Sequence, residues 1–186
     1  MMTEYDYSLL RSSGKNTFIS QNVEIRRPHL VSVGSNVAID TGFYCTTNLD
    51  IGDYIHIGPY VTVIGGASGL LKMGNFTTIA AGSRIICASD EHLGAGLVGP
   101  TIPDLYKDST KIEPVIFEDF ASVATNVVIT PGVTLAEGTV IGANSLVSKS
   151  TEPWTIYVGS PAKPIKLRNK DTMLDYAEKL GYGAKK

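Results

Sequence analysis

The chain carries an aliphatic or small apolar residue at every sixth position over two long stretches and one short stretch between them. The members of these runs are Val33, Ile39, Cys45, Ile51, Ile57 and Val63, then Met73, Ile79 and Ile85, then Phe117, Val123, Ile129, Leu135, Ile141 and Val147. A helix would need apolar spacings of three and four, and a β-sandwich would show longer strands every 8 to 12 residues. A fixed short period is typical of a solenoid. The pattern therefore predicts stacked short strands, with three hexapeptides forming each triangular coil.

Three places interrupt the repeat. The phase slips between Pro28 and Val33, and again after Val63 around the glycine-rich run 65–69. The largest break, residues 88–114, is rich in Gly, Pro and Asp and has no period. A loop of this length inside a regular array is usually functional or disordered. We therefore expect residues 88–114 to form an excursion from the stack that carries chemistry.

The predicted domain organisation has one repeat domain between two terminal segments. These are an N-terminal segment 1–16, an all-β repeat domain 17–168 with its loop 88–114, and a C-terminal helix and tail 169–186. Residues 170–180 have helical apolar spacing, and Gly181 is the expected helix stop. Because an array needs a cap, we expect this helix or an altered last coil to cover the open end.

Composition narrows the class of protein. A length of 186 residues fits one domain, and the net charge of −2 gives no support for binding nucleic acid or a membrane surface. The first residues, MMTEYDYSLL, lack the basic and apolar regions of a signal peptide, so we expect a cytoplasmic protein. Cys45 and Cys87 have no metal-ligand spacing and are expected to be buried free thiols.

The [LIV]-G-x-x-x-x repeats, the long loop and the terminal run PGVTLAEGTVIGANSLVSKSTEPWTIYVGSPAKPIK resemble the hexapeptide-repeat acyltransferases. The most similar subgroup is the galactoside, maltose and nodulation-type acetyltransferases of bacteria, and the resemblance covers about residues 17–168. It implies a left-handed parallel β-helix, which departs from the usual right-handed crossover. It also implies a homotrimer with acetyl-CoA bound in clefts between neighbouring subunits.

Acetyl transfer needs a base, a thioester within reach and donors for the oxyanion. The resemblance places the catalytic histidine at the entry of the long loop, where CASDEH ends in His92. An imidazole has an ordinary pKa of about 6.5 and suits this role. Asp90 or Glu91 would hold the ring or stabilise the imidazolium. In a gap-free comparison His92 falls two positions late and Asp90 occupies the expected place. The alternative is a solvated loop histidine.

The stretch from Phe43 to Leu49 resembles the acceptor-binding strand of the galactoside enzymes. An asparagine that contacts the sugar there is replaced here by Thr46, while Asn48 is retained and Tyr44 precedes them. The resemblance therefore implies that Tyr44, Thr46 and Asn48 bind the acceptor. The alternative is that Thr46 and Asn48 are ordinary corner residues.

For the donor, the resemblance places backbone groups of Thr125 and Ala143 along the pantetheine arm and Ser148 near the adenine. Lys163 and Lys166 stand where arginines are common in the family and would face the CoA phosphates. Lysine meets a phosphate as a point charge without the bidentate fork of arginine. The alternative is a pair of solvated lysines.

These features predict an acetyl-CoA-dependent O-acetyltransferase that acts on a sugar hydroxyl by His-assisted direct transfer in a ternary complex. The alternative is an N-acetyltransferase for a nucleotide-linked amino sugar of surface polysaccharide, on the same repeats. A zinc hydratase of the γ-carbonic anhydrase type needs closely spaced histidine ligands, which His29, His56 and His92 do not provide, and no metal is expected. His56 is instead expected at an outward strand position. The terminal run and the long loop argue against a non-catalytic scaffold.

Overall fold

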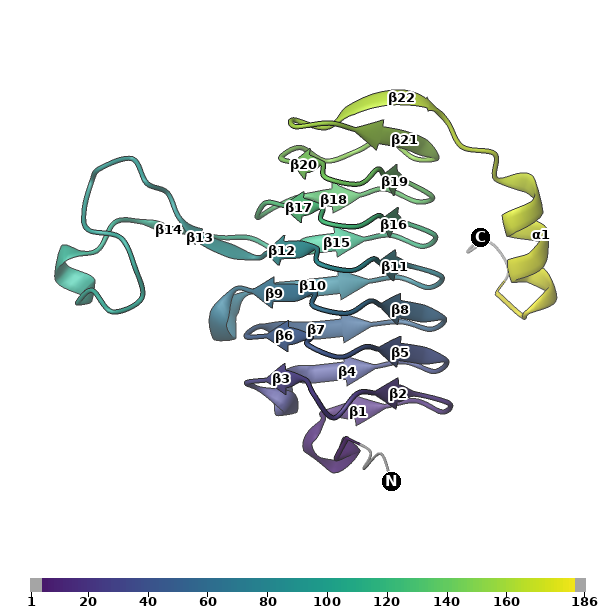
Figure 1. Ribbon diagram of the computed structural model, residues 1–186, viewed down its shortest axis with the longest axis horizontal. Coiled ribbons are helices and arrows are strands. Elements are labelled where there is room, and N and C mark those ends of the chain that lie inside the picture. The colour runs from purple at the N-terminus through teal and green to yellow at the C-terminus, as the bar shows by residue number, and fades with distance from the viewer. Residues whose placement is uncertain (1–4, 183–186) are drawn as a thin grey trace.

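The computed structural model describes residues 5–182, so residues 1–4 and 183–186 of the predicted terminal segments lie outside the description. The chain is a left-handed parallel β-helix, a stack of triangular coils with one strand on each of three faces (Figure 1). The solenoid predicted from the six-residue period is confirmed. We call the faces A, B and C in the order in which the chain visits them.

The strands of each face run parallel to one another, except for the last strand of face B. Face A consists of β1 (Ser12–Ser13), β4 (Val31–Val33), β7 (Asn48–Ile51), β10 (Leu70–Met73), β15 (Val115–Phe117) and β18 (Thr134–Leu135). Face B consists of β2 (Phe18–Ile19), β5 (Val37–Ile39), β8 (Ile55–Ile57), β11 (Thr78–Ile79), β16 (Ser122–Val123), β19 (Val140–Ile141), β21 (Thr155–Val158) and β22 (Lys163–Leu167). Face C consists of β3 (Glu24–Ile25), β6 (Tyr44–Cys45), β9 (Thr62–Ile64), β12 (Arg84–Ile86), β17 (Val128–Ile129) and β20 (Leu146–Val147).

The period-six residues form the core because the register stacks them. Cys45 pairs with Val63 and Val63 pairs with Ile85, and all three side chains are fully buried. Side chains of a strand alternate between its two faces, so the neighbours of each core residue point outward. Burial of one such aliphatic side chain stabilises the fold by about 1.5–3 kcal/mol. Cys45 and Cys87 are free and buried, as predicted.

The three corners of the triangle differ in regularity. The A/B and B/C corners are tight turns with residues in the left-handed region, such as Asn36 (φ 58°) and Asn126 (φ 58°). The C/A corner carries every interruption of the repeat. A 3₁₀ turn at Pro28–Leu30 follows β3, another at Gly66–Ser68 follows β9, and the largest excursion follows β12. Irregular structure is therefore concentrated along one edge of the prism.

The excursion at residues 88–114 is an arm. It begins and ends in a two-stranded antiparallel hairpin, β13 (Ala88–Asp90) and β14 (Thr110–Ile112), and its tip contains a 3₁₀ turn at Asp104–Tyr106. Figure 1 shows the arm projecting away from the stack, on the side opposite α1. The sequence located this segment but did not indicate its strands, because they are short and half-exposed or exposed.

The C-terminal helix predicted at residues 170–180 is present as α1 (Asp171–Lys179), and Gly181 follows it with a φ of 88°. It does not cap the open end. The last coil is closed by β22, which turns back antiparallel on β21, while α1 lies beside the stack at the A/B corner (Figure 1). The altered last coil therefore provides the cap.

The helix lies there because the A/B corner is a ladder of aromatic rings. Its rings are Tyr54, Phe76, Phe120 and Trp154, and each neighbouring pair has centroids 5.0–5.6 Å apart. Ala177 of α1 is buried against this ladder. Residues 5–182 contain no helix that is long and apolar enough to span a bilayer.

Candidate active site

The acceptor residues predicted from the sequence lie at the C/A corner, below the arm. Thr46 accepts hydrogen bonds at its hydroxyl from the backbone N–H groups of Gly65 (3.3 Å) and Gly66 (3.5 Å). Asn48 donates through its side-chain amide to the carbonyl oxygens of Ala67 (2.7 Å) and Gly69 (2.8 Å). Both side chains therefore shape the small-residue loop of the next coil, and Tyr44 lies half-buried one strand earlier on face C.

That small-residue loop packs directly beneath the base of the arm. A Cβ atom at Gly65 would lie 2.8 Å from the Cβ atom of Cys87 and 3.0 Å from the Thr47 hydroxyl. Only glycine allows three successive coils to approach this closely. The hydroxyl of Thr47 is buried and has no hydrogen-bond partner among residues 5–182. The corner thus joins the predicted acceptor-binding residues to the arm through close backbone packing.

The two carboxylates next to His92 hold the arm together. Asp90 accepts hydrogen bonds from the backbone N–H of Gly99 (2.7 Å) and from the Thr110 hydroxyl (3.0 Å). The Gly99 N–H, and then the Thr110 hydroxyl, lower the pKa of Asp90 below its ordinary value. Glu91 accepts from the Ser109 hydroxyl, and its own N–H donates to the Ser109 carbonyl at 2.9 Å. Asp90 and Glu91 therefore stabilise the β13–β14 hairpin and the arm, and no hydrogen bond joins either carboxylate to the His92 ring.

His92 stands at the start of the arm's irregular part. It is exposed and adopts the left-handed region with a φ of 57°. Within the described part of the chain its ring makes no side-chain hydrogen bond. The imidazole is therefore open to an incoming molecule on the arm, and no hydrogen bond from residues 5–182 orients it.

The predicted donor residues lie on the upper coils. Thr125 and Ala143 occupy stacked turns of the B/C corner, where the Asn144 N–H donates to the Thr125 carbonyl at 3.0 Å. Lys163 and Lys166 are exposed on β22 at the end of the stack. Thr125 and Ala143 thus lie along one edge of face C, and the arm leaves from the other edge. One copy of the chain does not bring His92 to them.

Ser148 follows β20 and is exposed at the C/A corner of the sixth coil. It shares that corner with the predicted acceptor-binding residues and lies across face C from Thr125 and Ala143. The structure thus separates Ser148, which was predicted near the adenine, from the two residues predicted along the pantetheine arm.

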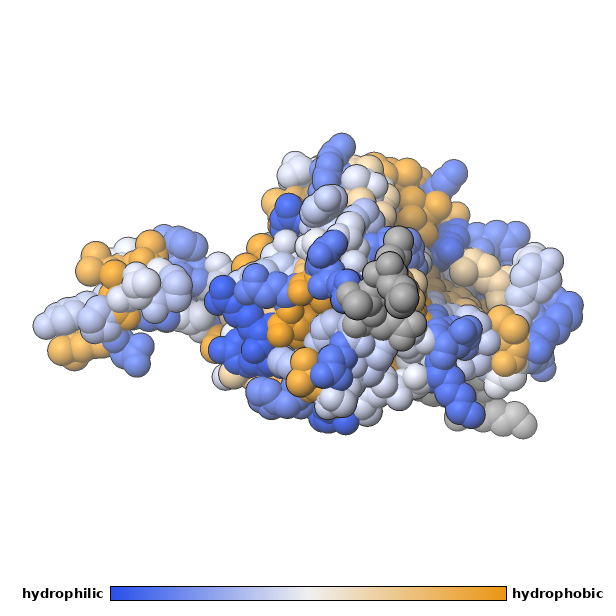
Figure 2. Space-filling view, turned by 60° about the horizontal axis from the view of Figure 1, so that its bottom comes forward, coloured by the Kyte–Doolittle hydropathy of each residue, from blue (hydrophilic) through white to orange (hydrophobic). Residues whose placement is uncertain are grey.

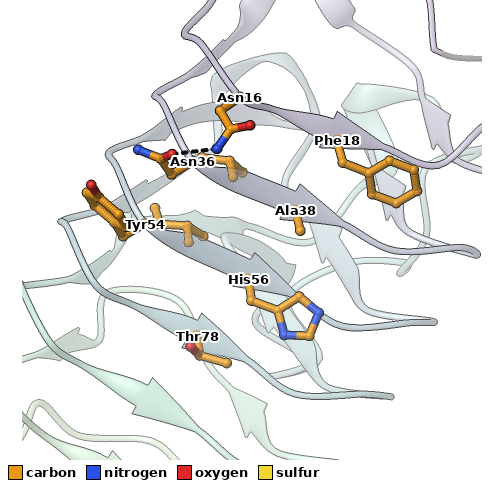
Figure 3. Close-up of a pocket in the computed structure, with 9 residues that line it drawn as sticks. Asn16, Phe18, Asn36, Ala38, Tyr54, His56 and Thr78 are labelled. Carbon is orange, nitrogen blue, oxygen red and sulfur yellow. Dashed lines mark hydrogen bonds between the residues drawn. The ribbon is translucent and has the colours of Figure 1, made fainter.

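A shallow groove on face B holds a second imidazole (Figure 3). His56 Nε2 lies 3.0 Å from Asp40 Oδ2, and the amide of Asn16 donates to Asn36 at 2.8 Å on the rim. The outward position predicted for His56 is confirmed by its exposed side chain. The Asp40 partner was not apparent from the sequence, because the two residues meet only when adjacent coils stack. The His56 and Asp40 side chains are 53% and 34% exposed, so the pair contributes little stability.

The arm exposes large apolar side chains. The most exposed are Leu93 (79%), Leu97 (60%), Leu105 (84%) and Tyr106 (62%). Figure 2 shows hydrophobic residues gathered on this projecting segment. Several large apolar side chains exposed on one segment are typical of a contact with another molecule. Among the described residues no group of three His, Cys, Asp or Glu side chains is arranged to hold a metal ion.

Comparison with known proteins gives a consistent result. No protein-family model matches the chain. It is 32% identical over 167 residues to the dTDP-4-amino-4,6-dideoxy-D-glucose acyltransferase of Escherichia coli, covering 86% of this chain and 83% of that protein. It is 28% identical over 149 residues to the galactoside O-acetyltransferase of Escherichia coli K12, covering 80% of this chain and 62% of that protein.

The solved structures agree. AntD, an N-acyltransferase from Bacillus cereus crystallised with dTDP and 3-hydroxybutyryl-CoA, superposes with a TM-score of 0.90 at 33% identity, covering 97% of this chain and 98% of that chain. A variant of AntD with dTDP-4-amino-4,6-dideoxyglucose and coenzyme A gives the same TM-score. The stacked hexapeptide coils, the arm and the similarity along nearly the whole chain place this protein in the hexapeptide-repeat acyltransferase family, as an acyltransferase.

Proposed function

We propose that this protein transfers an acyl group from acyl-CoA to the amino group of a nucleotide-linked amino sugar. The observation that carries the proposal is the similarity to AntD along nearly the whole chain. The AntD structures contain CoA or an acyl-CoA together with dTDP or dTDP-4-amino-4,6-dideoxyglucose. The match to a galactoside O-acetyltransferase is weaker and covers less of that relative. N-transfer, the alternative reading of the sequence, is therefore preferred here to O-transfer.

The proposed donor site runs along the upper coils. Acetyl-CoA would lie against the exposed turns of Thr125 and Ala143, where small side chains leave the backbone accessible. Ser148 would contact the adenine end. Lys163 and Lys166, both exposed on β22, would neutralise the CoA phosphates.

The reaction needs no covalent enzyme intermediate. The amine nitrogen attacks the thioester carbonyl, the tetrahedral intermediate collapses, and the C–S bond breaks to release CoA. The proton lost by the nitrogen ends on the CoA thiol, and we propose His92 as the group that carries it. Tyr44, Thr46 and Asn48 would position the sugar below the arm.

The division of the site between two edges of face C favours a site shared between copies. We propose that the chain forms a homotrimer in which the arm of one subunit brings His92 to the Thr125 edge of its neighbour. The apolar side chains of the arm, such as Leu93 and Leu105, would be covered in that contact. Two buried free thiols suit a reducing compartment, so we place the reaction in the cytoplasm.

The test is release of free thiol from acetyl-CoA with a panel of dTDP-linked amino sugars, UDP-sugars and simple sugars. We expect turnover only with a nucleotide-linked amino sugar. The product should resist mild base, since an amide survives conditions that hydrolyse an ester. A base-labile product from a simple sugar would instead support O-acetyl transfer. Absence of turnover together with absence of CoA binding would contradict both reactions.

A further inference from the structure

The lowest loop of the C/A corner carries two consecutive arginines that differ in their surroundings. Arg26 contacts Glu24, with Nε and Oε1 2.9 Å apart, and its guanidinium lies 5.4 Å from the centre of the Tyr44 ring. Arg27 is half-buried and donates from Nη1 to the carbonyl oxygen of Thr46 at 2.7 Å. Within residues 5–182 no carboxylate oxygen lies within 4.0 Å of its guanidinium nitrogens.

The contact with Thr46 orients Arg27 without neutralising it. One N–H group is held by the backbone of the next coil, so the planar guanidinium is fixed while its other donors stay available. A guanidinium in this state suits a phosphate group, because its fork of donors matches two phosphate oxygens. Thr46 is also the residue whose hydroxyl shapes the loop beneath the arm.

The position of Arg27 along the corner fits a phosphorylated acceptor. Its guanidinium reaches the second coil at Thr46, and the arm leaves the fourth coil at Cys87. Two coil heights correspond to about 10 Å. That separation spans a sugar ring and its bridging oxygen, with the reacting amine at the arm and the phosphates at Arg27.

We infer that Arg27 binds the diphosphate of a nucleotide-linked acceptor, with Arg26 as a second cation beside it. The inference rests on the proposed function and adds the residue that distinguishes a nucleotide-linked sugar from a free one. CoA also carries phosphates, but its proposed site at Lys163 and Lys166 lies at the opposite end of the stack. Separate titrations with dTDP and with CoA therefore distinguish the two sources of phosphate.

Arg84 provides a matched control. It is an exposed arginine with no carboxylate within 4.0 Å among the described residues, and its Nη1 donates to the carbonyls of Tyr60 (2.9 Å) and Gly82 (2.5 Å). It has the same chemistry as Arg27 but begins β12 on face C, beside the B/C corner. Calorimetric titration of the full-length chain with dTDP and with CoA would compare the wild type, Arg27→Ala, Arg27→Lys and Arg84→Ala.

We expect Arg27→Ala to weaken dTDP binding by about tenfold or more, the usual effect of losing hydrogen bonds to a charged group. CoA binding should not change, and Arg84→Ala should bind dTDP normally. Arg27→Lys retains the charge but loses the fork, so an intermediate loss is expected; this variant carries the test if Arg27→Ala does not fold. In turnover, Arg27→Ala should raise KM for the nucleotide-linked sugar and leave kcat largely intact.

The contrary outcomes separate the two proposals. Unchanged dTDP affinity in Arg27→Ala would overturn the inference and leave the proposed function standing. Loss of dTDP binding in Arg84→Ala alone would place the phosphate near the B/C corner. Loss of CoA binding in Arg27→Ala would assign Arg27 to the donor site. If the wild type binds CoA but neither binds dTDP nor acylates a nucleotide-linked sugar, the proposed function fails and the inference fails with it.

Discussion

The phenol of Tyr182 donates a 2.5 Å hydrogen bond to Asp53 Oδ2, which joins two residues 129 positions apart in the chain. The same ring meets Phe76 edge to face, with centroids 5.1 Å apart. The hydrogen bond to the Asp53 carboxylate raises the pKa of Tyr182 to about 12. Tyr182 thus fastens α1 against the aromatic ladder.

This contact predicts an alkaline transition at the A/B corner. The pKa of a free tyrosine is about 10, so a raised folded value means that the neutral phenol stabilises the docked helix. The stabilisation is fully present below pH 10 and is lost as the pH rises through about 12. Near-ultraviolet circular dichroism should record the release of α1 in that window. Tyr182→Phe should remove this transition, and an unaltered titration in the variant would contradict the assignment.

The ladder also predicts an unequal effect of two glycine substitutions. Gly138 has a φ of 68°, and a Cβ atom there would lie 2.3 Å from the Trp154 ring, whereas Gly66 has a φ of 63° and open space around it. Gly66→Ala should cost about 1–2 kcal/mol of unfolding free energy from backbone strain alone. Gly138→Ala should cost more, since it must also displace a buried indole. Chemical denaturation followed by the fluorescence of the single tryptophan measures the free energy of unfolding of both variants. Equal losses of stability in the two variants would show that the Trp154 ring moves aside at no cost.

The two thiols should be unreactive in the folded protein. Burial raises the pKa of Cys45 to about 12 and that of Cys87 to about 11. Because the thiolate is the reactive form, alkylation at pH 8 should wait for unfolding. Counting thiols with a colorimetric disulfide reagent before and after denaturant should give none, then two. Rapid modification of the native protein would indicate that the C/A corner opens.

His92 and His56 offer a matched pair of substitutions for testing the proposed proton transfer. On the proposed mechanism His92→Ala should lower kcat, by about 10²–10⁴ if proton transfer by the imidazole limits the rate. At higher pH more of the acceptor amine is already neutral and depends less on the imidazole to remove a proton. The loss of kcat in His92→Ala should therefore become smaller as the pH rises. His56→Ala, on face B, should leave kcat unchanged. Thiol-release assays from pH 6 to pH 9 compare the two variants, and a loss confined to His56→Ala would transfer the role to the His56–Asp40 pair.

The ordered structure of the arm should depend on the Asp90 carboxylate. Hydrogen bonds from Gly99 and Thr110 keep the pKa of this carboxyl below its ordinary value, so its contribution to the arm is present at neutral pH and is lost as the pH falls through that lowered pKa. Asp90→Asn should loosen the arm and raise KM for the acceptor while the β-helix stays intact. Hydrogen exchange of residues 88–114 would measure the loosening. Unchanged protection there would contradict this role.

Much of the fold was predictable from the sequence alone. A six-residue period gives each coil the same strand positions, so the buried residues follow directly from the repeat and Ile39, Ile57 and Ile79 are all fully buried. The helix ending before Gly181 was equally visible from local spacing. The sequence also located the arm, because residues 88–114 break the repeat. The roles of the predicted site residues stay predictions.

The relations between coils were decided only by the tertiary structure. The sequence gives no reason for a phenylalanine at the turn position of Phe120. In the structure, stacking of the coils places its ring parallel to that of Phe76, with centroids 5.2 Å apart and an interplanar angle of 4°. The contacts of His56 with Asp40 and of Arg27 with Thr46 likewise join residues 16 and 19 positions apart. A periodic pattern specifies what happens within one coil. Contacts between outward side chains depend on corner insertions and register, which shift each coil relative to the next and leave no periodic signal in the sequence.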